Sequence, residues 1–438
     1  MQADKTTIND LSIFSHEEEH SVFHHLDFTR TIGGKDWLRV FLSRPLNDLK
    51  KIIETQRILQ GITKVLSQWP ETITNGTVMV IEKFYETAIE SIPHSSNAVN
   101  AASYKYLNGS DYSLLRYSVT HFIEFVKGLK QTADILSGEN LALTLDLMIQ
   151  RIHSVLNRDL LREMLEWPKE KKLAPHDVIH FGHYVRYHFK QEAIELIEIY
   201  SKLDAWYSLA LAVEKHHYTF PSFIESDEPS IYAKQMYHPL LQTPVAYDVN
   251  LTQQQNFLFM TGANMAGKST FIKAVGVSVY LAHIGMAVPA QEMRLTTFYG
   301  LLSNIQVVDN IVQGESYFFN EVQRIRKTIE KISDGQKWLI LIDELFKGTN
   351  VQDAMKCSTV VIEGLRKMHN SLFILSTHLY EIGEALKKYP NIQFRYFETE
   401  VKNDQLLFSY QLKEGISNDR LGYLILKREG VVELLDKL

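Results

Sequence analysis

Residues 257–270 read Phe-Leu-Phe-Met-Thr-Gly-Ala-Asn-Met-Ala-Gly-Lys-Ser-Thr, a hydrophobic run followed by the pattern Gly-x-x-x-x-Gly-Lys-Ser. The run predicts a buried strand, and Phe271, Ile272, Val275 and Val279 predict an apolar helix directly after the pattern. Glycines let such a loop turn its backbone N–H groups toward phosphate oxygens, and the helix N-terminus adds its positive dipole. The segment therefore predicts a phosphate-binding loop between a strand and a helix.

The side chains of this loop suit ATP and Mg²⁺. Lys268 places a positive charge near the β- and γ-phosphates, and the Ser269 hydroxyl is a ligand for Mg²⁺. The predicted nucleotide-binding residues are Gly262, Ala263, Asn264, Met265, Ala266, Gly267, Lys268, Ser269 and Thr270.

Composition limits the class of protein. The 438 residues are 45% hydrophobic and 22% charged, which fits two or three domains with real cores and excludes a mostly disordered chain. A net charge of −6 excludes an evenly basic nucleic-acid binder, although 46 Lys and Arg leave room for a local basic face. With one cysteine, no apolar signal core and no membrane-length apolar run, we expect a cytoplasmic protein that makes no use of a membrane.

The chain changes character near residue 225. Up to that point hydrophobic residues follow helical spacing, and the four clearest predicted helices are Asp48–Leu66, Asp111–Ile135, Asn140–Leu165 and His183–His216. A stretch rich in Ser and Asn, Pro93–Gly109, predicts a loop. The basic run Lys169-Glu170-Lys171-Lys172 is typical of a solvated face rather than of a DNA contact.

Beyond residue 229 short apolar runs alternate with helical segments. Such runs are typical of parallel strands buried on both faces, and they are Phe257–Thr261, Trp338–Ile342 and Leu372–Ser376. Two later runs, Phe394–Thr399 and Leu406–Gln411, predict a β-hairpin. The sequence thus predicts an all-helical domain over residues 1–225 and an α/β domain with a mostly parallel sheet over residues 226–438, divided within Pro221–Pro229.

Two predicted strands end in polar residues that suit phosphoryl chemistry. Asp343 after the second strand is a candidate Mg²⁺ ligand, and Glu344 a candidate general base for the attacking water. His378 after the third strand is a candidate contact to the γ-phosphate or to that water. Strands of such sheets present their carboxyl ends at one edge, so the three residues are expected to meet the loop. The alternative is two solvated acids and a structural histidine.

With these motifs in order, the chain resembles the MutS family of DNA mismatch-repair ATPases, a branch of the ABC-type ATPases. The similarity extends weakly into the helical half, through segments such as Leu203-Asp204. It is strongest in the segments Thr261–Thr270, Gly314–Phe318, Leu341–Asn350 and Ser376–His378, which resemble the family's TGPNMGGKST, G-x-S-T-F, LLDEIGRGTS and ATH.

The resemblance implies a mechanism. Family members act as dimers, so Ser316 is expected to reach the γ-phosphate held by the partner subunit, with Lys268, Glu344 and His378 catalytic in each subunit. The expected partners are DNA, whether duplex, mismatched or branched, and a second copy or a paralogue. The expected function is an ATP-driven clamp on DNA in repair or recombination.

The departures also matter. The chain starts where the family's helical core starts, which predicts a helical core and lever plus ATPase without the mismatch-reading domain. Phe346-Lys347 replaces Gly-Arg, and no adenine-stacking residue can be assigned within Thr243–Tyr247. Two other functions stay open: a different ABC-type ATPase, such as a transporter subunit or chromosome-structure protein, and a non-hydrolysing ATP switch.

Overall fold

The computed structural model describes residues 1–94, 97–138, 140–168, 171–305, 317–402, 405–417 and 431–435. They form two compact units. The α/β unit comprises Met1–His25, Arg44–Ile52 and His216–Leu438, and the helical unit comprises Leu26–Ser43 and Ile53–Lys215. These units differ from the predicted domains, because the first 25 residues join the α/β unit rather than the helical one.

A seven-stranded sheet forms the centre of the α/β unit. In spatial order its strands are β1 (Gln2–Ala3), β7 (Gly300–Asn304), β8 (Trp338–Asp343), β9 (Ser371–Ser376), β5 (Phe257–Thr261), β10 (Ile392–Lys402) and β11 (Gln405–Glu414). Every neighbouring pair is parallel except β10 and β11, which form the predicted hairpin. The three predicted buried strands are confirmed as β5, β8 and β9, which lie next to one another.

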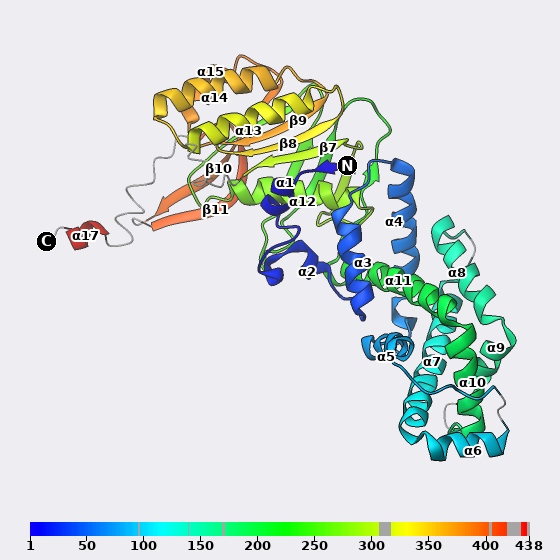
Figure 1. The fold of residues 1–438 in the computed structure, drawn as a ribbon. Helices are drawn as coiled ribbons and strands as arrows, with labels where there is room; N and C mark the ends of the chain where they lie inside the picture. Colours follow the sequence, from blue (N-terminus) through cyan, green and yellow to red (C-terminus); the bar gives the residue numbers. More distant parts are fainter. Residues whose placement is uncertain are drawn as a thin grey trace. The chain divides into compact units, whose positions relative to one another are not determined.

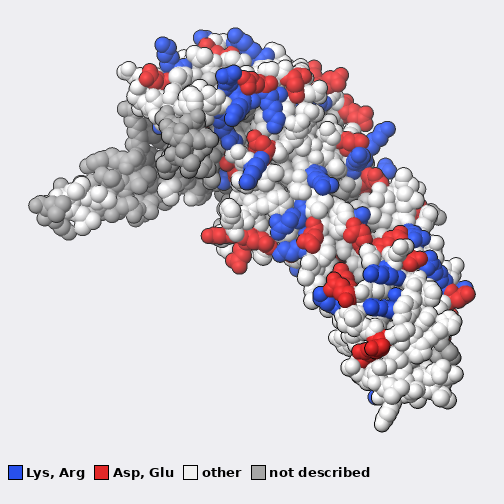
Figure 2. Space-filling model, in the orientation of Figure 1, with Lys and Arg blue, Asp and Glu red and all other residues white. Residues whose placement is uncertain are grey.

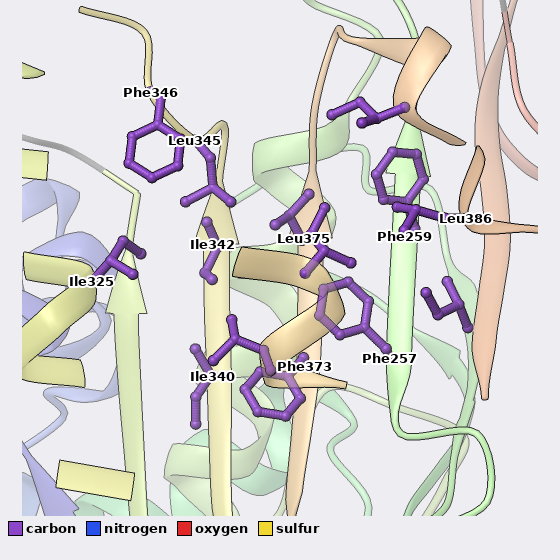
Figure 3. Packing of buried hydrophobic residues seen from close by; sticks show 14 of the residues in the cluster. Phe257, Phe259, Ile325, Ile340, Ile342, Leu345, Phe346, Phe373, Leu375 and Leu386 are labelled. Atoms are coloured by element: carbon purple, nitrogen blue, oxygen red, sulfur yellow. The ribbon is translucent and has the colours of Figure 1, made fainter. Parts of the chain in front are cut away.

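Helices cover both faces of this sheet (Figure 1). On one face lie α13 (Tyr317–Ile332), α14 (Val351–Leu365) and α15 (Tyr380–Leu386), and on the other lies α12 (Lys268–His283). Figure 3 shows the core under the first group, where Phe257 of β5 stacks on Phe373 of β9 with ring centroids 5.6 Å apart. Burial of both sheet faces explains why the sequence of these strands is uniformly apolar.

The N-terminal segment is built into this sheet. Strand β1 pairs with β7, and the helix that follows, α1 (Lys5–Asp10), packs beside the same strand. Asp10 Oδ2 accepts hydrogen bonds from Ser303 Oγ at 2.6 Å and from Ile305 N at 3.0 Å. Thr7 Oγ1 accepts from Ser303 N at 2.9 Å. The carboxyl end of β7 is thereby held by residues almost 300 positions earlier in the chain.

A second, smaller sheet was not predicted. Its strands, in spatial order, are β2 (Ser222–Phe223), β6 (Glu292–Leu295), β3 (Ile231–Met236) and β4 (Tyr247–Leu251). They are short, and β4 alternates buried and exposed positions, a much weaker sequence signal than a continuous apolar run. The remaining short elements of the chain are η1 (Glu18–His20), α2 (Val22–Leu26), η2 (Leu66–Gln68) and α17 (Val431–Leu435).

The helical unit follows the predicted pattern with two corrections. Its helices are α3 (Ile32–Ser43), α4 (Leu49–Thr63, whose first turn belongs to the α/β unit), α5 (Asn75–Glu86), α6 (Ala98–Leu107), α7 (Gly109–Leu136), α8 (Leu143–Leu156), α9 (Asp159–Glu166), α10 (Pro175–His188) and α11 (Lys190–His216). The predicted helices at 140–165 and 183–216 are each interrupted, near Asn157 and at Phe189. The loop predicted at 93–109 was wrong, because Asn97 caps α6, whose Ala101 and Tyr104 are buried.

One buried carboxylate organises the helical unit. Asp204 of α11 is fully buried and accepts hydrogen bonds from Arg30 N at 3.1 Å, from Thr31 N at 2.9 Å and from Thr31 Oγ1 at 2.7 Å. Burial raises its pKa above the ordinary range, and these hydrogen bonds oppose the rise. Asp204 therefore fixes the start of α3 against α11. In the described part of the chain, no helix has the length and apolar character needed to cross a membrane.

Candidate functional site

The loop between β5 and α12 has the backbone that its glycines predict. Gly262 and Gly267 have φ values of 144° and 110°, in the region that only glycine adopts readily. A Cβ on Gly262 would also lie 3.1 Å from Phe397 Cβ. Asn264 and Met265 are exposed at the tip of the loop, with Met265 at φ 68°. The loop is thus a strained turn held closely against β10.

Lys268 lies at the centre of this turn. Its side chain is 5% exposed, and Nζ donates to Gly262 O at 2.7 Å and to Ala263 O at 2.9 Å. Burial lowers the pKa of Lys268, while the nearby Glu344 and Asp343 oppose that change. Two carbonyl groups of the loop therefore position the Lys268 ammonium group, near the carboxylates of Glu344 and Asp343.

Asp343 joins three elements at the carboxyl edge of the sheet. It is the last residue of β8, and its two carboxylate oxygens accept hydrogen bonds from Ser269 Oγ of α12 and from Ser376 Oγ of β9. Asp343 and Ser269 are the two predicted Mg²⁺ ligands, and the structure brings them into contact. The sequence reasoning assigned no role to Ser376, although a polar residue ending an apolar strand was a signal for one.

Glu344 lies beside Asp343 in a left-handed backbone conformation, with φ 61°. Its Oε1 lies 3.8 Å from His378 Nδ1, too long for a hydrogen bond, and its Oε2 lies 3.1 Å from Lys347 Nζ. The neighbouring His378 and then Lys347 lower the pKa of Glu344 to about 2, against the effect of burial. His378 itself is 55% exposed. Glu344 is thus an ionised carboxylate that lies between the Lys347 ammonium group and the His378 ring.

Glu321 supports the turn that follows Glu344, a role the sequence reasoning missed. It is 1% exposed on α13, and its two oxygens accept from Lys347 N at 3.2 Å and Gly348 N at 3.3 Å. Burial raises its pKa. Phe346, at φ 60°, packs its ring on Phe318 of α13 with centroids 5.7 Å apart. The unusual Phe346 therefore anchors this turn in the core (Figure 3).

These side chains surround one cavity of about 690 Å³. Its lining includes the loop with Lys268 and Ser269, the residues Asp343, Glu344 and Lys347, and also Leu241, Thr243, Val245, Tyr247 and Tyr410. Tyr247 is 6% exposed and packs edge-on against Phe271 and Phe397; burial raises its pKa to about 12. Tyr410 of β11 is 40% exposed. Of the two tyrosines, only Tyr410 presents much free ring surface to the cavity.

Most of the predicted site residues are therefore neighbours. Lys268, Ser269, Asp343 and Glu344 line the cavity, and His378 lies next to Glu344. The predicted trans-acting residue, Ser316, lies outside the described residues. Among the residues that are described, no three His, Cys, Asp or Glu side chains gather as a metal-binding group.

Comparison with known proteins agrees with the motifs. Residues 258–433, which include the loop and both strand-end motifs, match the family MutS domain V. The matched part of the chain belongs to the MutS family. This confirms the resemblance inferred from its motifs, and the MutS match begins in β5 and extends through the hairpin.

Similar proteins include three that are named DNA mismatch repair protein MutS. The protein from Pseudothermotoga lettingae is 30% identical over 233 residues, covering 52% of this chain and 28% of that protein. The Listeria innocua protein is 30% identical over 52% of this chain and 27% of its own length. The Thermotoga maritima protein is 29% identical over 55% of this chain and 30% of its own length. The matched region thus spans less than a third of each MutS relative.

Proposed function

We propose that the α/β unit is an ABC-type P-loop ATPase that binds ATP with Mg²⁺ in this cavity and hydrolyses it. The observation that carries the proposal is the pair of hydrogen bonds that Ser269 and Ser376 donate to Asp343 at the carboxyl edge of the sheet. They bring a loop residue and two strand ends to one point, where ligands of parallel sheets bind. The cavity volume of 690 Å³ lies within the range of small-molecule sites.

The residues present fit Mg²⁺. The Ser269 hydroxyl and the Asp343 carboxylate are oxygen ligands of the type this cation prefers, and they are already in contact. Two protein ligands are enough, because Mg²⁺ usually keeps waters and takes further oxygens from substrate phosphates. The bound ion would neutralise negative charge on the phosphates. Lys268 would orient the same phosphates from the loop.

Glu344 is the proposed general base. It is ionised throughout the neutral pH range and lies at the cavity edge beside His378, the second group proposed to contact the attacking water or the γ-phosphate. The carboxylate would orient and polarise the water. Because phosphoryl transfer needs positioning more than proton abstraction, a weakly basic carboxylate is sufficient.

A second candidate function is an ATP switch that does not turn over. The contact of 3.1 Å between Lys347 Nζ and Glu344 favours it, because a carboxylate held in an ion pair is a poorer base. Replacing Glu344 separates the two functions. In E344Q we expect ATP to bind while the hydrolysis rate falls by about 100-fold or more.

Single-turnover hydrolysis and nucleotide binding, measured on the same preparation, provide the test. E384Q is the matched control, since Glu384 is an exposed glutamate of α15, away from the cavity, paired with Lys387. Equal turnover in wild type and E344Q would refute Glu344 as the base. No turnover in wild type, with ATP bound, would favour the switch.

The assembly and the partner are also proposals. We infer a dimer, of two copies or with a paralogue, in which Ser316 completes the partner's site, and an ATP-driven clamp on duplex, mismatched or branched DNA. The family motifs and the names of the relatives support this inference. Membership of the MutS family also disfavours a transporter or chromosome-structure ATPase. Stimulation of ATP turnover by one of these DNA structures tests the DNA role, and no binding to any of them would refute it.

A further inference from the structure

The helical unit contains a larger cavity, of about 1200 Å³, which we call the α7 hollow. One wall is a single face of α7, lined by Arg116, Tyr117, Thr120, His121, Ile123, Glu124, Lys127, Lys130 and Gln131. The opposite wall is lined by Leu165, Trp167, Pro168, Lys171, Lys172 and Leu173, and Thr72 also lines the hollow. None of these residues belongs to the ATP site.

The α7 hollow is basic in a chain that is acidic as a whole. Among the described residues, five cationic side chains line it, against the one carboxylate of Glu124, which lies 3.2 Å from His121 Nδ1. On the face drawn in Figure 2, basic and acidic side chains are intermingled over the α/β unit, while few lie at the end of the helical unit around α6. The net charge of −6 makes such a local excess of cations notable. An anionic ligand is therefore the complementary occupant.

The two walls are held together before any ligand arrives. Lys127 Nζ of α7 donates to the Trp167 carbonyl on the opposite wall. The Trp167 ring packs edge-on against Phe181 of α10, with centroids 5.6 Å apart, and its Nε1 donates to Lys171 O at 2.9 Å. Lys171 Nζ lies 4.4 Å from the centre of the same ring. Preorganisation of this kind lowers the entropy cost of binding.

Several groups in the hollow still have binding capacity. Thr72 Oγ1 is buried and has no hydrogen-bond partner among the described residues. Within the same described part of the chain, neither Arg116 nor Lys172 forms an ion pair, whereas Lys130 pairs with Asp134. Tyr117 lies on the α7 wall with 56% of its surface exposed. Two cations without an ion pair among the described residues and a largely exposed aromatic ring, which contacts His121 edge-on, thus line one space.

We propose that the α7 hollow binds a segment of single-stranded nucleic acid. Cations on both walls would contact the phosphates, and Tyr117 would stack on a base, the combination by which proteins hold single strands. A concave site between two walls suits one strand, and stacking requires an unpaired base. Lys171 and Lys172, assigned from sequence to a solvated face, become ligand contacts. The proposal is independent of ATP hydrolysis.

Fluorescence anisotropy with a labelled oligothymidylate of about 20 nucleotides tests the proposal on the full chain, over a range of salt. In the double variant R116Q/K172Q we expect affinity to fall at least about tenfold and the salt dependence to weaken, because about 0.7 counterion is released per single-strand phosphate contact. In Y117A we expect a loss of about fivefold or more with the salt dependence unchanged.

The control is K64Q/K105Q, which removes the same charge from exposed positions of the helical unit outside the hollow and should keep the wild-type affinity. Melting temperatures show that each variant folds. Affinity equal to the control in R116Q/K172Q would overturn the proposal. It would also be overturned if polyglutamate of matched charge competed as well as oligothymidylate and Y117A bound normally, because the occupant would then be an acidic protein. Tighter binding of duplex than of single strand at the hollow would overturn it too.

Discussion

The α/β unit and the helical unit place their charged groups in opposite ways. At the proposed ATP site the charged groups are buried and hydrogen-bonded: Asp343 accepts from two serines, Glu321 from two backbone amides, and Lys268 donates to its own loop. In the α7 hollow the cations line open walls, and two of them have no ion-pair partner among the described residues. A catalytic site needs charged groups that are held in place, while a site that binds a flexible strand needs charged groups that are accessible to it.

The largest expected effect tests whether buried polar groups matter as much in the helical unit. We expect Asp204→Ala to lower the free energy of unfolding by about 3 kcal/mol, because three hydrogen-bond donors of Arg30 and Thr31 lose their acceptor in a buried place. Urea unfolding followed by circular dichroism measures the change. The control Asp146→Ala removes a half-buried carboxylate of α8 whose side-chain partner is Gln150, and it should cost less than about 1 kcal/mol. A loss no larger than the control's would mean that Asp204 is dispensable.

The second prediction concerns pH and the ionised Glu344 of the proposed ATP site. The pKa of Glu344 is lowered to about 2 from its ordinary 4.5, so the folded state favours the ionised form. Its contribution to stability is complete above about pH 4.5 and is lost as pH falls toward 2; by pH 3 the loss is about 2 kcal/mol. The stability difference between wild type and E344Q, from urea titrations at stepped pH, should shrink accordingly. A difference that is constant with pH would contradict the shift.

The smallest expected effect concerns Glu321, which positions the turn after Glu344. In E321Q one of the two acceptor oxygens is replaced by an NH₂ group that faces a backbone N–H. We expect a roughly tenfold lower kcat with little change in KM, equivalent to about 1.4 kcal/mol. E330Q, on the exposed side of the same helix, is the control. If kcat is unchanged while the melting temperature falls, Glu321 contributes to stability alone.

The sequence predicted the parts whose signal is local. Strands β5, β8 and β9 are continuous apolar runs, and the loop between β5 and α12 is a contiguous motif, so both could be placed without knowing the fold. The small sheet and α6 could not be predicted, because β4 alternates and the Ser- and Asn-rich stretch 93–109 around α6 hides its buried Ala101 and Tyr104. Their conformation is decided by tertiary packing rather than by local preference.

The site shows the same division. Lys268, Ser269, Asp343 and Glu344 stand in motifs, and the strand-end rule was enough to bring them together. The role of Glu321 was missed, because its partners are the backbone N–H groups of Lys347 and Gly348. Every residue except proline has such a group, so the sequence does not indicate which ones will bond to Glu321. The α7 hollow combines residues up to 101 positions apart without any shared pattern, from Thr72 to Leu173. Such a surface can be found only from the folded chain.

The docking of the N-terminal segment on β7 has a consequence for biosynthesis. Thr7 and Asp10 are synthesised almost 300 residues before their hydrogen-bond partner Ser303. Leu11 and Ile13 are buried in the folded α/β unit. The later residues of that unit are missing while the helical unit is synthesised and can fold. A fragment cut at residue 226 would likewise leave β7 as an unprotected edge strand, prone to aggregation. Expression of the α/β unit without the helical unit therefore calls for supplying residues 1–25 in trans or by fusion.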